Sequence, residues 1–545
     1  MPKVALGLDY GTGSVRALLV DTATGEELGS ATYEYPHGSG GVVEDPKDPN
    51  LGRQHPADHL EGARQTIREV LASTGIDAKD IVGIGVDTTG SSPIPVDKDG
   101  VPLALAEDLK DDPDAMCWLW KDHTSHAEAA EITALAKEMG RPYLAKCGGT
   151  YSSEWFWSKI LRFTRIRPDL VERTGSWVEL ADLVPAWLTG TLAHPQRGVC
   201  AAGHKAMYHT DWGGLPDKEF LAALHPKLAE LRDGLYDEAV CSNHLAGHVT
   251  AEIAAETGLV EGTPVAVGAF DAHMGAVGSG VGVGTIVKIM GTSTCDIMVH
   301  PLDEELKDIP GVCGIVPGSV IPGAHGIEAG QSAVGDIFAW WAETVGQDQR
   351  TLTEEALKLA PGESGLVALD WHNGNRTILV DPLLTGLVVG QTIHTTAAEM
   401  YRAFVEATAY GSLKIIERIE EYGVPIERVV ACGGIAEKSA LTMQIYADVF
   451  DREVAVSRSA QTCALGAAVF GAVVGGAYPS VEEAQKAMTG VRENTYKPNP
   501  QSTAVYKELY AVYSDLHDAF GGVRTVDLGG AMKALIRIRD AARKG

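Results

Sequence analysis

The stretch that decides the fold is residues 4–30, VALGLDYGTGSVRALLVDTATGEELGS. An apolar run ends at Asp9, a glycine turn follows, and a second apolar run, RALLVD, leads into the turn signal TATG. This pattern predicts a hairpin of two strands. A Walker A loop would carry GK[ST] and continue into a helix, and the Rossmann spacing G-x-G-x-x-G is also absent.

The same pattern returns near the middle of the chain. Residues 284–300 read GTIVKIMGTSTCDIMVH, again two apolar runs joined by Gly-Thr-Ser-Thr. A short β-rich run that ends in small and hydroxyl residues follows each hairpin at a distance, IVGIGVDTTGSSP at 81–93 and RVVACGGIAEKS at 428–439. This weak internal repeat predicts two α/β lobes of similar plan, with the two glycine loops facing each other across a cleft.

The Gly-rich stretch 262–284 marks the expected boundary between the lobes. We therefore predict a first lobe at 1–268, a second lobe at 269–485, and a helical C-terminal extension at 486–545 that packs on the second lobe. Amphipathic helices should flank the strands, as the stretch from Ala397 indicates.

Composition limits the possible partners. With 545 residues the chain is too long for one core, and its net charge of −28 disfavours nucleic acid and anionic membranes as partners. Nucleotides remain possible, because backbone donors and a metal can bind phosphate inside an acidic protein. The eight cysteines include no C-x-x-C pair and are expected to be reduced thiols. The N-terminus has no signal pattern, so we expect a cytoplasmic protein.

The two glycine loops are candidate phosphate sites. Glycine allows close backbone approach to a phosphate, and hydroxyls add donors. Asp9 is placed to contact Mg²⁺ through water, and Arg16 to reach the transferred phosphate. The alternative is an ordinary glycine hairpin with an Asp–Arg pair, but the repetition of the loop favours phosphate. The loop residues are Gly11, Thr12, Gly13, Ser14, Gly291 and Thr292.

Three further residues have two interpretations each. Asp271, at the end of an apolar strand, is a plausible general base or a helix N-cap. Lys205 and Glu328 lie among small residues and could bind sugar hydroxyls or be ordinary surface charges. The tryptophans at 118, 120, 155 and 157 are expected to pack in a core or between domains.

Taken together, residues 3–485 resemble the FGGY carbohydrate kinases, which share the actin/hexokinase-type (ribonuclease H-like) ATPase fold. Two segments of this chain resemble the family's first and second phosphate loops, namely DYGTGSVRALLVD at 9–21 and IMGTSTC at 289–295. The family's C-terminal signature is similar to residues 384–411, although Gln391 stands where an apolar residue is usual, and its adenosine segment is similar to residues 431–450.

The resemblance implies roles for these residues. Asp271 would be the catalytic base and would also contact the sugar, with Asp9 organising Mg²⁺ through water. Thr12 and Thr292 would lie near the γ-phosphate of ATP. The sugar would also meet Gly90, Lys205 and Glu328, and the nucleotide side would include Gly335, Gly434 and Lys438, the last at a position where some relatives carry Asn.

Several segments are similar to the L-ribulose-specific branch of the family: LWKDHTSHAEA at 119–129, GHKAMYH at 203–209, GAFDAH at 268–273 and GIEAGQSAVGD at 326–336. They imply phosphorylation of L-ribulose to L-ribulose 5-phosphate in L-arabinose catabolism. A kinase for D-ribulose, ribitol or xylulose is the nearest alternative, and a non-catalytic actin-like nucleotide switch is the alternative from another class. The sequence does not give the oligomeric state, and a homodimer stays open.

Overall fold

The predicted N-terminal hairpin is present in the computed structural model, which describes residues 3–544. Strands β1 (Val4–Tyr10) and β2 (Ser14–Asp21) pair antiparallel, and Asp9 stands opposite Arg16. β6 (Ile81–Thr88) runs parallel to β1 on its other side, which places Asp87 beside Asp9. Two carboxylates therefore meet at the carboxyl ends of neighbouring parallel strands.

The first sheet grows outward from this centre. Its order is β10-β11-β6-β1-β2-β3, and the short β12 pairs with the end of β6. The central strands are buried on both faces, as expected for apolar runs covered by helices. The remaining strands of this sheet are β3 (Glu27–Glu34), β10 (Leu245–His248), β11 (Pro264–Ala266) and β12 (Ala269–Phe270).

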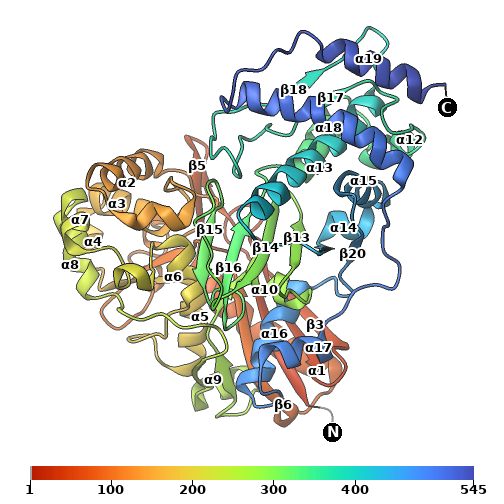
Figure 1. The fold of residues 1–545 in the computed structure, drawn as a ribbon. Coiled ribbons are helices and arrows are strands. Elements are labelled where there is room, and N and C mark those ends of the chain that lie inside the picture. Colours follow the sequence, from red (N-terminus) through yellow and green to blue (C-terminus); the bar gives the residue numbers. More distant parts are fainter. Residues whose placement is uncertain (1–2, 545) are drawn as a thin grey trace.

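A second sheet repeats the plan. β13 (Thr285–Met290) and β14 (Thr294–Pro301) form the second predicted hairpin, and β19 (Arg428–Cys432) runs parallel to β13. The order is β15-β16-β14-β13-β19-β20, and the other members are β15 (Gly314–Pro317), β16 (Ala324–Ala329) and β20 (Val454–Val456). The predicted fold of two mixed sheets flanked by helices is confirmed (Figure 1).

Two helices join the sheets. α10 (Asp271–Gly278) follows the first sheet, and α16 (Thr462–Val474), although it follows the second sheet in sequence, packs on α10, β1 and β6 (Figure 1). Glycines allow this close approach, since a Cβ on Gly278 would lie 2.8 Å from the backbone nitrogen of Gly466. Elements from both halves of the chain thus interleave here, and the domain boundaries at 268 and 485 stay predictions.

The residues between the main strands of the first half form an irregular, Trp-rich layer, as the sequence indicates. Its core gathers Trp118, Trp155 and Trp157. Two small sheets belong to it, β4 (Val43–Asp45) with β5 (Asp48–Gln54) and β8 (Cys117–Trp118), and β7 (Pro93–Val96) with β9 (Ser176–Glu179). The helices of this half are α1 (Pro56–Thr74), α2 (His126–Glu138), α3 (Phe156–Ile166), α4 (Pro168–Val171), α5 (Leu180–Thr189), α6 (Val199–Lys205), α7 (Lys218–Leu224), α8 (Pro226–Asp233) and α9 (Ala251–Thr257).

The second half surrounds its sheet with longer helices. α13 (Ala397–Glu421) begins with a capping box of Thr396 and Glu399, which explains why a helix starts there. The other elements are α11 (Gly335–Thr344), α12 (Gln349–Ala356), α14 (Gly434–Lys438), α15 (Ala440–Phe450), α17 (Val481–Met488), β17 (Val367–Leu369) and β18 (Leu387–Val389).

The chain ends in two helices, α18 (Pro500–Phe520) and α19 (Ala531–Ala542). α18 contacts α13, α15 and β17, and α19 lies on α18 at the far end from α16 (Figure 1). Among residues 3–544, no helix combines the length and apolar character needed to cross a membrane. All eight cysteines are unpaired, as predicted.

Candidate active site

The first glycine loop is held from outside by two side chains. The turn closes through a hydrogen bond from the Gly11 N–H to the Ser14 carbonyl (2.9 Å). The Gln54 amide donates to the Thr12 carbonyl (2.6 Å), and the Trp120 indole N–H donates to the Thr12 hydroxyl (3.0 Å). The predicted loop is therefore a braced turn, with both the backbone and the hydroxyl of Thr12 fixed.

The second glycine loop closes in the same way, since the Gly291 N–H donates to the Ser293 carbonyl (2.9 Å). Its Thr292 carbonyl accepts from the first turn of α11, and the Gly335 N–H donates to the Gly291 carbonyl (3.2 Å). A Cβ on Gly335 would lie 2.7 Å from that carbonyl, so only glycine allows this approach.

The remaining nucleotide-side candidates lie nearby. Gly434 opens α14 directly after β19, and the side chain of Ile435 reaches Gly335. The structure therefore brings Gly291, Gly335 and the Gly434 turn together. Lys438, at the end of the same short helix, is exposed and three residues beyond Ile435.

Three carboxylates converge at the ends of β1, β6 and β12. Asp9 and Asp87 are register partners, and Asp271 follows β12, which pairs with β6 at Asp87 and Thr88. Asp87 is fully buried and neither of its carboxylate oxygens has a hydrogen-bond partner. The Arg16 guanidinium is 3.8 Å from the Asp9 carboxylate, and the arginine is the more exposed of the two side chains.

Mutual repulsion and burial change the protonation of this group. Burial raises the pKa of Asp9, and burial together with the neighbouring Asp9 and Asp271 raises that of Asp87 well above its ordinary value. Burial and the Asp9 charge raise the pKa of Asp271 to about 7. A carboxyl group that titrates near neutral pH suits a general base.

Asp271 is the first residue of α10, after the cap position held by Phe270. One of its oxygens accepts a hydrogen bond from the N–H of Ala272 (2.6 Å), so it does stabilise the helix start. The N-cap alternative is wrong by one residue, because Phe270 is the N-cap and makes no side-chain cap.

Lys205 and Glu328 form an ion pair. Lys205 ends α6, Glu328 lies in β16 of the second sheet, and the ammonium is 3.0 Å from both carboxylate oxygens. Both side chains are buried, so the surface-charge alternative is wrong for each. The Lys205 ammonium also lies 5.9 Å from the centre of the Phe270 ring, next to Asp271.

Two histidines extend this pair. His204 Nδ1 is 3.2 Å and His273 Nε2 is 3.9 Å from the same Glu328 oxygen, and His204 Nε2 is 3.0 Å from the Ser319 hydroxyl. By donor type and spacing His204, His273 and Glu328 could hold a metal ion. The Lys205 ammonium already occupies the carboxylate, which disfavours a second cation there. Both ring nitrogens of His273 are buried without a partner, which leaves them free for a polar ligand.

The turn at Gly90 lies against Phe270 and is held by hydrogen bonds to two buried charged side chains, Glu179 and Lys159. Glu179 accepts from the Ser91 hydroxyl and from the Ser92 N–H (2.7 Å). The ammonium of Lys159 donates to the Ser91 carbonyl (2.8 Å) and to those of Trp118 (3.1 Å) and Leu119 (2.8 Å). A Cβ on Gly90 would collide with the Phe270 ring, so the turn packs directly on the residue before Asp271.

Sequence reasoning missed Asp87, Lys159, Glu179 and the role of Trp120. Asp87 had a usable signal, because it lies near the end of the β-rich run 81–93, just before its small and hydroxyl residues. Lys159 and Glu179 had none, since each is an ordinary charge within a helical or strand pattern. Trp118, Trp155 and Trp157 pack in the core as predicted, but Trp120 is only partly buried and reaches the loop.

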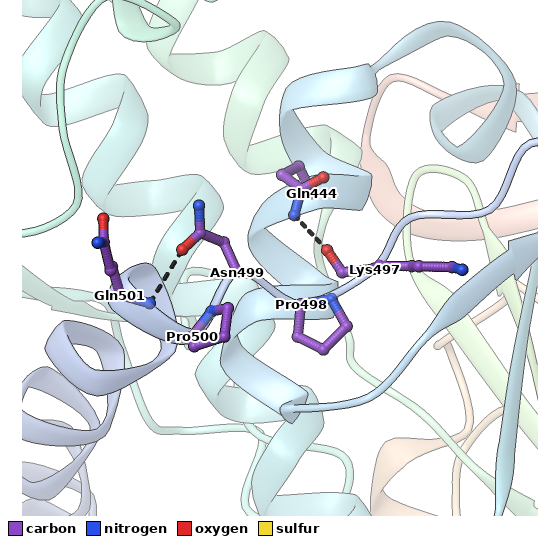
Figure 2. Close-up of a pocket in the computed structure, with 6 residues that line it drawn as sticks. All are labelled: Gln444, Lys497, Pro498, Asn499, Pro500 and Gln501. Atoms are coloured by element: carbon purple, nitrogen blue, oxygen red, sulfur yellow. Dashed lines mark hydrogen bonds between the residues drawn. The ribbon is translucent and has the colours of Figure 1, made fainter.

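The donor set fits a divalent cation near Asp9. Carboxylate oxygens are the ligands that Mg²⁺ prefers, and buried Asp87 adds two carboxyl oxygens without hydrogen-bond partners next to Asp9. A pocket at another place, shown in Figure 2, is lined by Gln444 and residues 497–501 at the junction of α15 and α18. It holds none of the predicted residues, and its Gln444 amide is bonded to the Lys497 carbonyl (2.9 Å).

Comparison with known proteins matches two family models. The N-terminal domain model of the FGGY family of carbohydrate kinases matches residues 4–278, and the C-terminal domain model matches residues 286–474. Together they cover both sheets and α16.

Curated relatives match over nearly the full length. A ribulokinase of Shouchella clausii is 42% identical and covers 100% of this chain and 99% of its own. A ribulokinase of Vibrio parahaemolyticus is 42% identical over 94% of this chain and 95% of its own. A ribulokinase of Mycolicibacterium smegmatis is 40% identical over 95% of this chain and 94% of its own.

Solved structures share the fold. A xylulose kinase from Rhodospirillum rubrum superposes with a TM-score of 0.79 at 22% identity, covering 95% of this chain and 99% of its own. A glycerol kinase from Plasmodium falciparum, solved with ADP, gives 0.76 at 14% identity over 94% and 98%. The same arrangement of sheets therefore serves kinases whose sequences have diverged widely.

Proposed function

Because this chain belongs to the FGGY family of carbohydrate kinases, we propose that it transfers the γ-phosphoryl group of ATP to L-ribulose, giving L-ribulose 5-phosphate in L-arabinose catabolism. The full-length identity of 40–42% to ribulokinases supports the acceptor. The observation that carries the chemistry is Asp271, a carboxyl with a pKa of about 7 whose charged neighbours are Asp9 and the Lys205–Glu328 pair.

In the proposed reaction Asp271 accepts the proton of the terminal sugar hydroxyl. That oxygen bonds to the γ-phosphorus while the bond to the ADP oxygen breaks. Asp271 is suited to this step because its ionised form is only moderately favoured, so it accepts a proton readily near neutral pH. Its position at the start of α10, with the Ala272 N–H on one oxygen, fixes the direction of the other.

The two glycine loops would hold the phosphates. Gly11, Gly13 and Gly291 would let the two turns approach the phosphates closely, and Ser14 would add a hydroxyl donor. Thr12 and Thr292 would face the γ-phosphate, with Arg16 nearby. Asp9 would hold Mg²⁺ through water, and that ion, when bound, neutralises charge on the phosphates. Gly335, Gly434 and Lys438 would line the rest of the nucleotide.

The sugar would lie against the Gly90 turn, Lys205, Glu328 and Asp271. An ammonium and a carboxylate in one buried pair offer both donors and acceptors to neighbouring hydroxyls, which suits a polyhydroxylated acceptor. We place the reaction in the cytoplasm, where ATP is available. We also propose the division into a first lobe at 1–268, a second lobe at 269–485 and a C-terminal extension at 486–545, with closure of the lobes excluding water.

A steady-state panel tests the acceptor. ADP release is measured with L-ribulose, D-ribulose, D-xylulose and ribitol at saturating MgATP. The proposal expects the highest kcat/KM with L-ribulose. A higher kcat/KM with another pentulose or with ribitol would transfer the proposal to that acceptor. ATP binding without sugar-stimulated turnover with any of them would favour the nucleotide switch.

A further inference from the structure

The tryptophan that reaches the first glycine loop donates its indole N–H to a side chain. Trp120 lies outside the hydrophobic cores, is only partly buried, and donates its indole N–H to the hydroxyl of Thr12 at 3.0 Å. The two residues are 108 positions apart in sequence. Within the described residues the indole N–H groups of four other tryptophans donate to backbone carbonyls, so a side-chain hydroxyl as acceptor sets Trp120 apart; the four are Trp118, Trp157, Trp212 and Trp341.

The direction of this hydrogen bond is fixed by the donor. An indole nitrogen can only donate, whereas a threonine hydroxyl has one proton and two acceptor lone pairs. Thr12 Oγ must therefore accept from Trp120, and its own proton must point elsewhere. Within residues 3–544 the Thr12 hydroxyl donates to no other group. Its proton is thus available to a ligand at the loop.

The backbone of Thr12 is fixed independently. Gln54, buried in β5, donates its amide N–H to the Thr12 carbonyl at 2.6 Å, and its amide oxygen lies 3.2 Å from His59 Nε2. One support therefore holds the peptide and a second holds the hydroxyl. Because Gln54 already fixes the backbone, the hydrogen bond from Trp120 sets only the orientation of the Thr12 hydroxyl group.

Trp120 itself is carried on a rigid segment. The buried ammonium of Lys159 binds the carbonyls of Trp118 and Leu119, the two residues before it. On its other side Asp122 accepts from the Gly52 N–H (2.9 Å) and pairs with buried Arg53. The same Lys159 ammonium binds the Ser91 carbonyl of the Gly90 turn (2.8 Å), so the sugar-side turn and the support of the phosphate loop share one anchor.

We propose that Trp120 is a positioning residue for phosphoryl transfer: its indole N–H holds the Thr12 hydroxyl as an acceptor, so that the hydroxyl proton is directed to the phosphoryl group that moves. This inference rests on the proposed function, in which Thr12 faces the γ-phosphate. A hydroxyl that accepts one hydrogen bond is also a stronger donor in the next, because hydrogen bonds in a chain polarise one another.

A double-mutant cycle tests this proposal, with kcat measured at saturating MgATP on the acceptor that the wild type uses best. Trp120→Phe removes the N–H and keeps an aromatic ring. We expect it to lower kcat about tenfold when Thr12 is present and less than about twofold in the Thr12→Val background, because two residues that act through one hydrogen bond are not additive. The KM for sugar should stay within about twofold. Thr12→Ser, which keeps the hydroxyl, should keep the full sensitivity to Trp120→Phe.

Trp212→Phe is the matched control, since Trp212 is also partly buried and donates its N–H at 2.9 Å, but to the Met207 carbonyl. Its kcat should equal that of the wild type. Equal losses of kcat for Trp120→Phe in both Thr12 backgrounds would overturn the proposal. So would a raised sugar KM with unchanged kcat, which would make Trp120 a sugar contact.

A second measurement needs no folded Trp120 variant. In protein labelled with ¹⁵N at the indole nitrogens of its ten tryptophans, one N–H signal should shift in Thr12→Val and keep its position in Thr12→Ser. An unchanged set of indole signals in Thr12→Val would contradict the hydrogen bond itself. Failure of L-ribulose as acceptor would count against the proposed function only, because the cycle is measured with the accepted sugar.

Discussion

Lys205 and Glu328 connect the two halves of the chain through one buried ion pair, in which the ammonium lies 3.0 Å from each carboxylate oxygen. Lys205 comes from α6 and Glu328 from the second sheet. Burial alone would raise the pKa of Glu328, but the Lys205 ammonium, with His204 and His273 nearby, holds this pKa well below its usual range. The pair therefore stays charged under all ordinary conditions.

Glu328→Gln should both weaken sugar binding and destabilise the protein. Removing one partner leaves a buried ammonium without its counter-charge, which typically costs about 3–5 kcal/mol. We expect a lower thermal unfolding midpoint and a sugar KM raised at least about tenfold, with the affinity for ADP little changed. The measurements are calorimetry and steady-state kinetics.

Glu354→Gln is the control for this variant. Glu354 pairs with Arg350 at 2.9 Å, but both side chains are mostly exposed, and such pairs contribute about 0–1 kcal/mol. Its unfolding midpoint should match the wild type. If Glu328→Gln behaved like the control in both measurements, the pair would have no role in stability or sugar binding.

Thr12→Val should lower kcat more than it changes the sugar KM. The valine keeps the volume of the side chain but cannot donate to a phosphate, and loss of one such donor costs about 10²-fold in comparable sites. Steady-state kinetics with varied sugar and varied ATP separates the two effects. A variant with normal kcat and a raised sugar KM would place this loop on the sugar instead of the phosphates.

The sequence predicts much of this architecture because local patterns decide it. The two hairpins are visible as apolar runs around Gly-Thr turns, and the strands at 81–88 and 428–432 follow from the same patterning. The convergence of Asp9 and Asp271 needs one further step, the pairing of both their strands with β6. Family resemblance, more than pattern, singled out Lys205 and Glu328.

Other parts of the site could not be predicted, for a physical reason. The contacts of Lys159 join residues 40 to 68 positions apart, and that of Trp120 to Thr12 spans 108. Such contacts depend on how irregular segments fold back, which no local periodicity encodes. The position of α16 against the first sheet is equally invisible, because an apolar Gly/Ala-rich helix can pack on either sheet.

Lys159→Met should disturb the sugar side more than the nucleotide side. The fully buried ammonium holds three carbonyls, and methionine fills its space without any donor, which leaves those carbonyls unsatisfied at about 1–3 kcal/mol each. We expect a lower unfolding midpoint and a raised sugar KM, with ADP affinity within about threefold of the wild type. Lys486→Met, at an exposed i,i+3 pair, is the control. A loss of ADP affinity as large as that of sugar would show general unfolding instead of a local effect.

Asp271→Asn should abolish phosphorylation and spare nucleotide binding. The amide has the same shape but cannot accept a proton, and loss of a general base typically costs about 10²–10⁴-fold in rate. We expect kcat to fall by this amount and the ADP dissociation constant, measured by calorimetry, to stay within about threefold. Asp303→Asn, a change at an exposed residue, should behave as the wild type. Turnover of Asp271→Asn near that of the wild type would rule out Asp271 as the base.

The pH profile gives an independent reading of the same group. Burial and the Asp9 charge raise the pKa of Asp271 to about 7 in the folded protein, and the base acts only when it is ionised. The value of kcat/KM should therefore be level above about pH 8 and fall about tenfold per pH unit below about 6, with the bend near 7.

Because folding favours the protonated form of Asp271, this residue makes the free protein less stable as pH rises from about 4 to about 7, and Asp271→Asn should remove that loss. Thermal unfolding in EDTA at pH 5 and pH 8 measures it: the variant should gain stability over the wild type at pH 8 more than at pH 5. A profile of kcat/KM that stays level down to pH 5.5, with the same difference in unfolding midpoint between variant and wild type at both pH values, would mean that Asp271 ionises normally and that another group takes the proton.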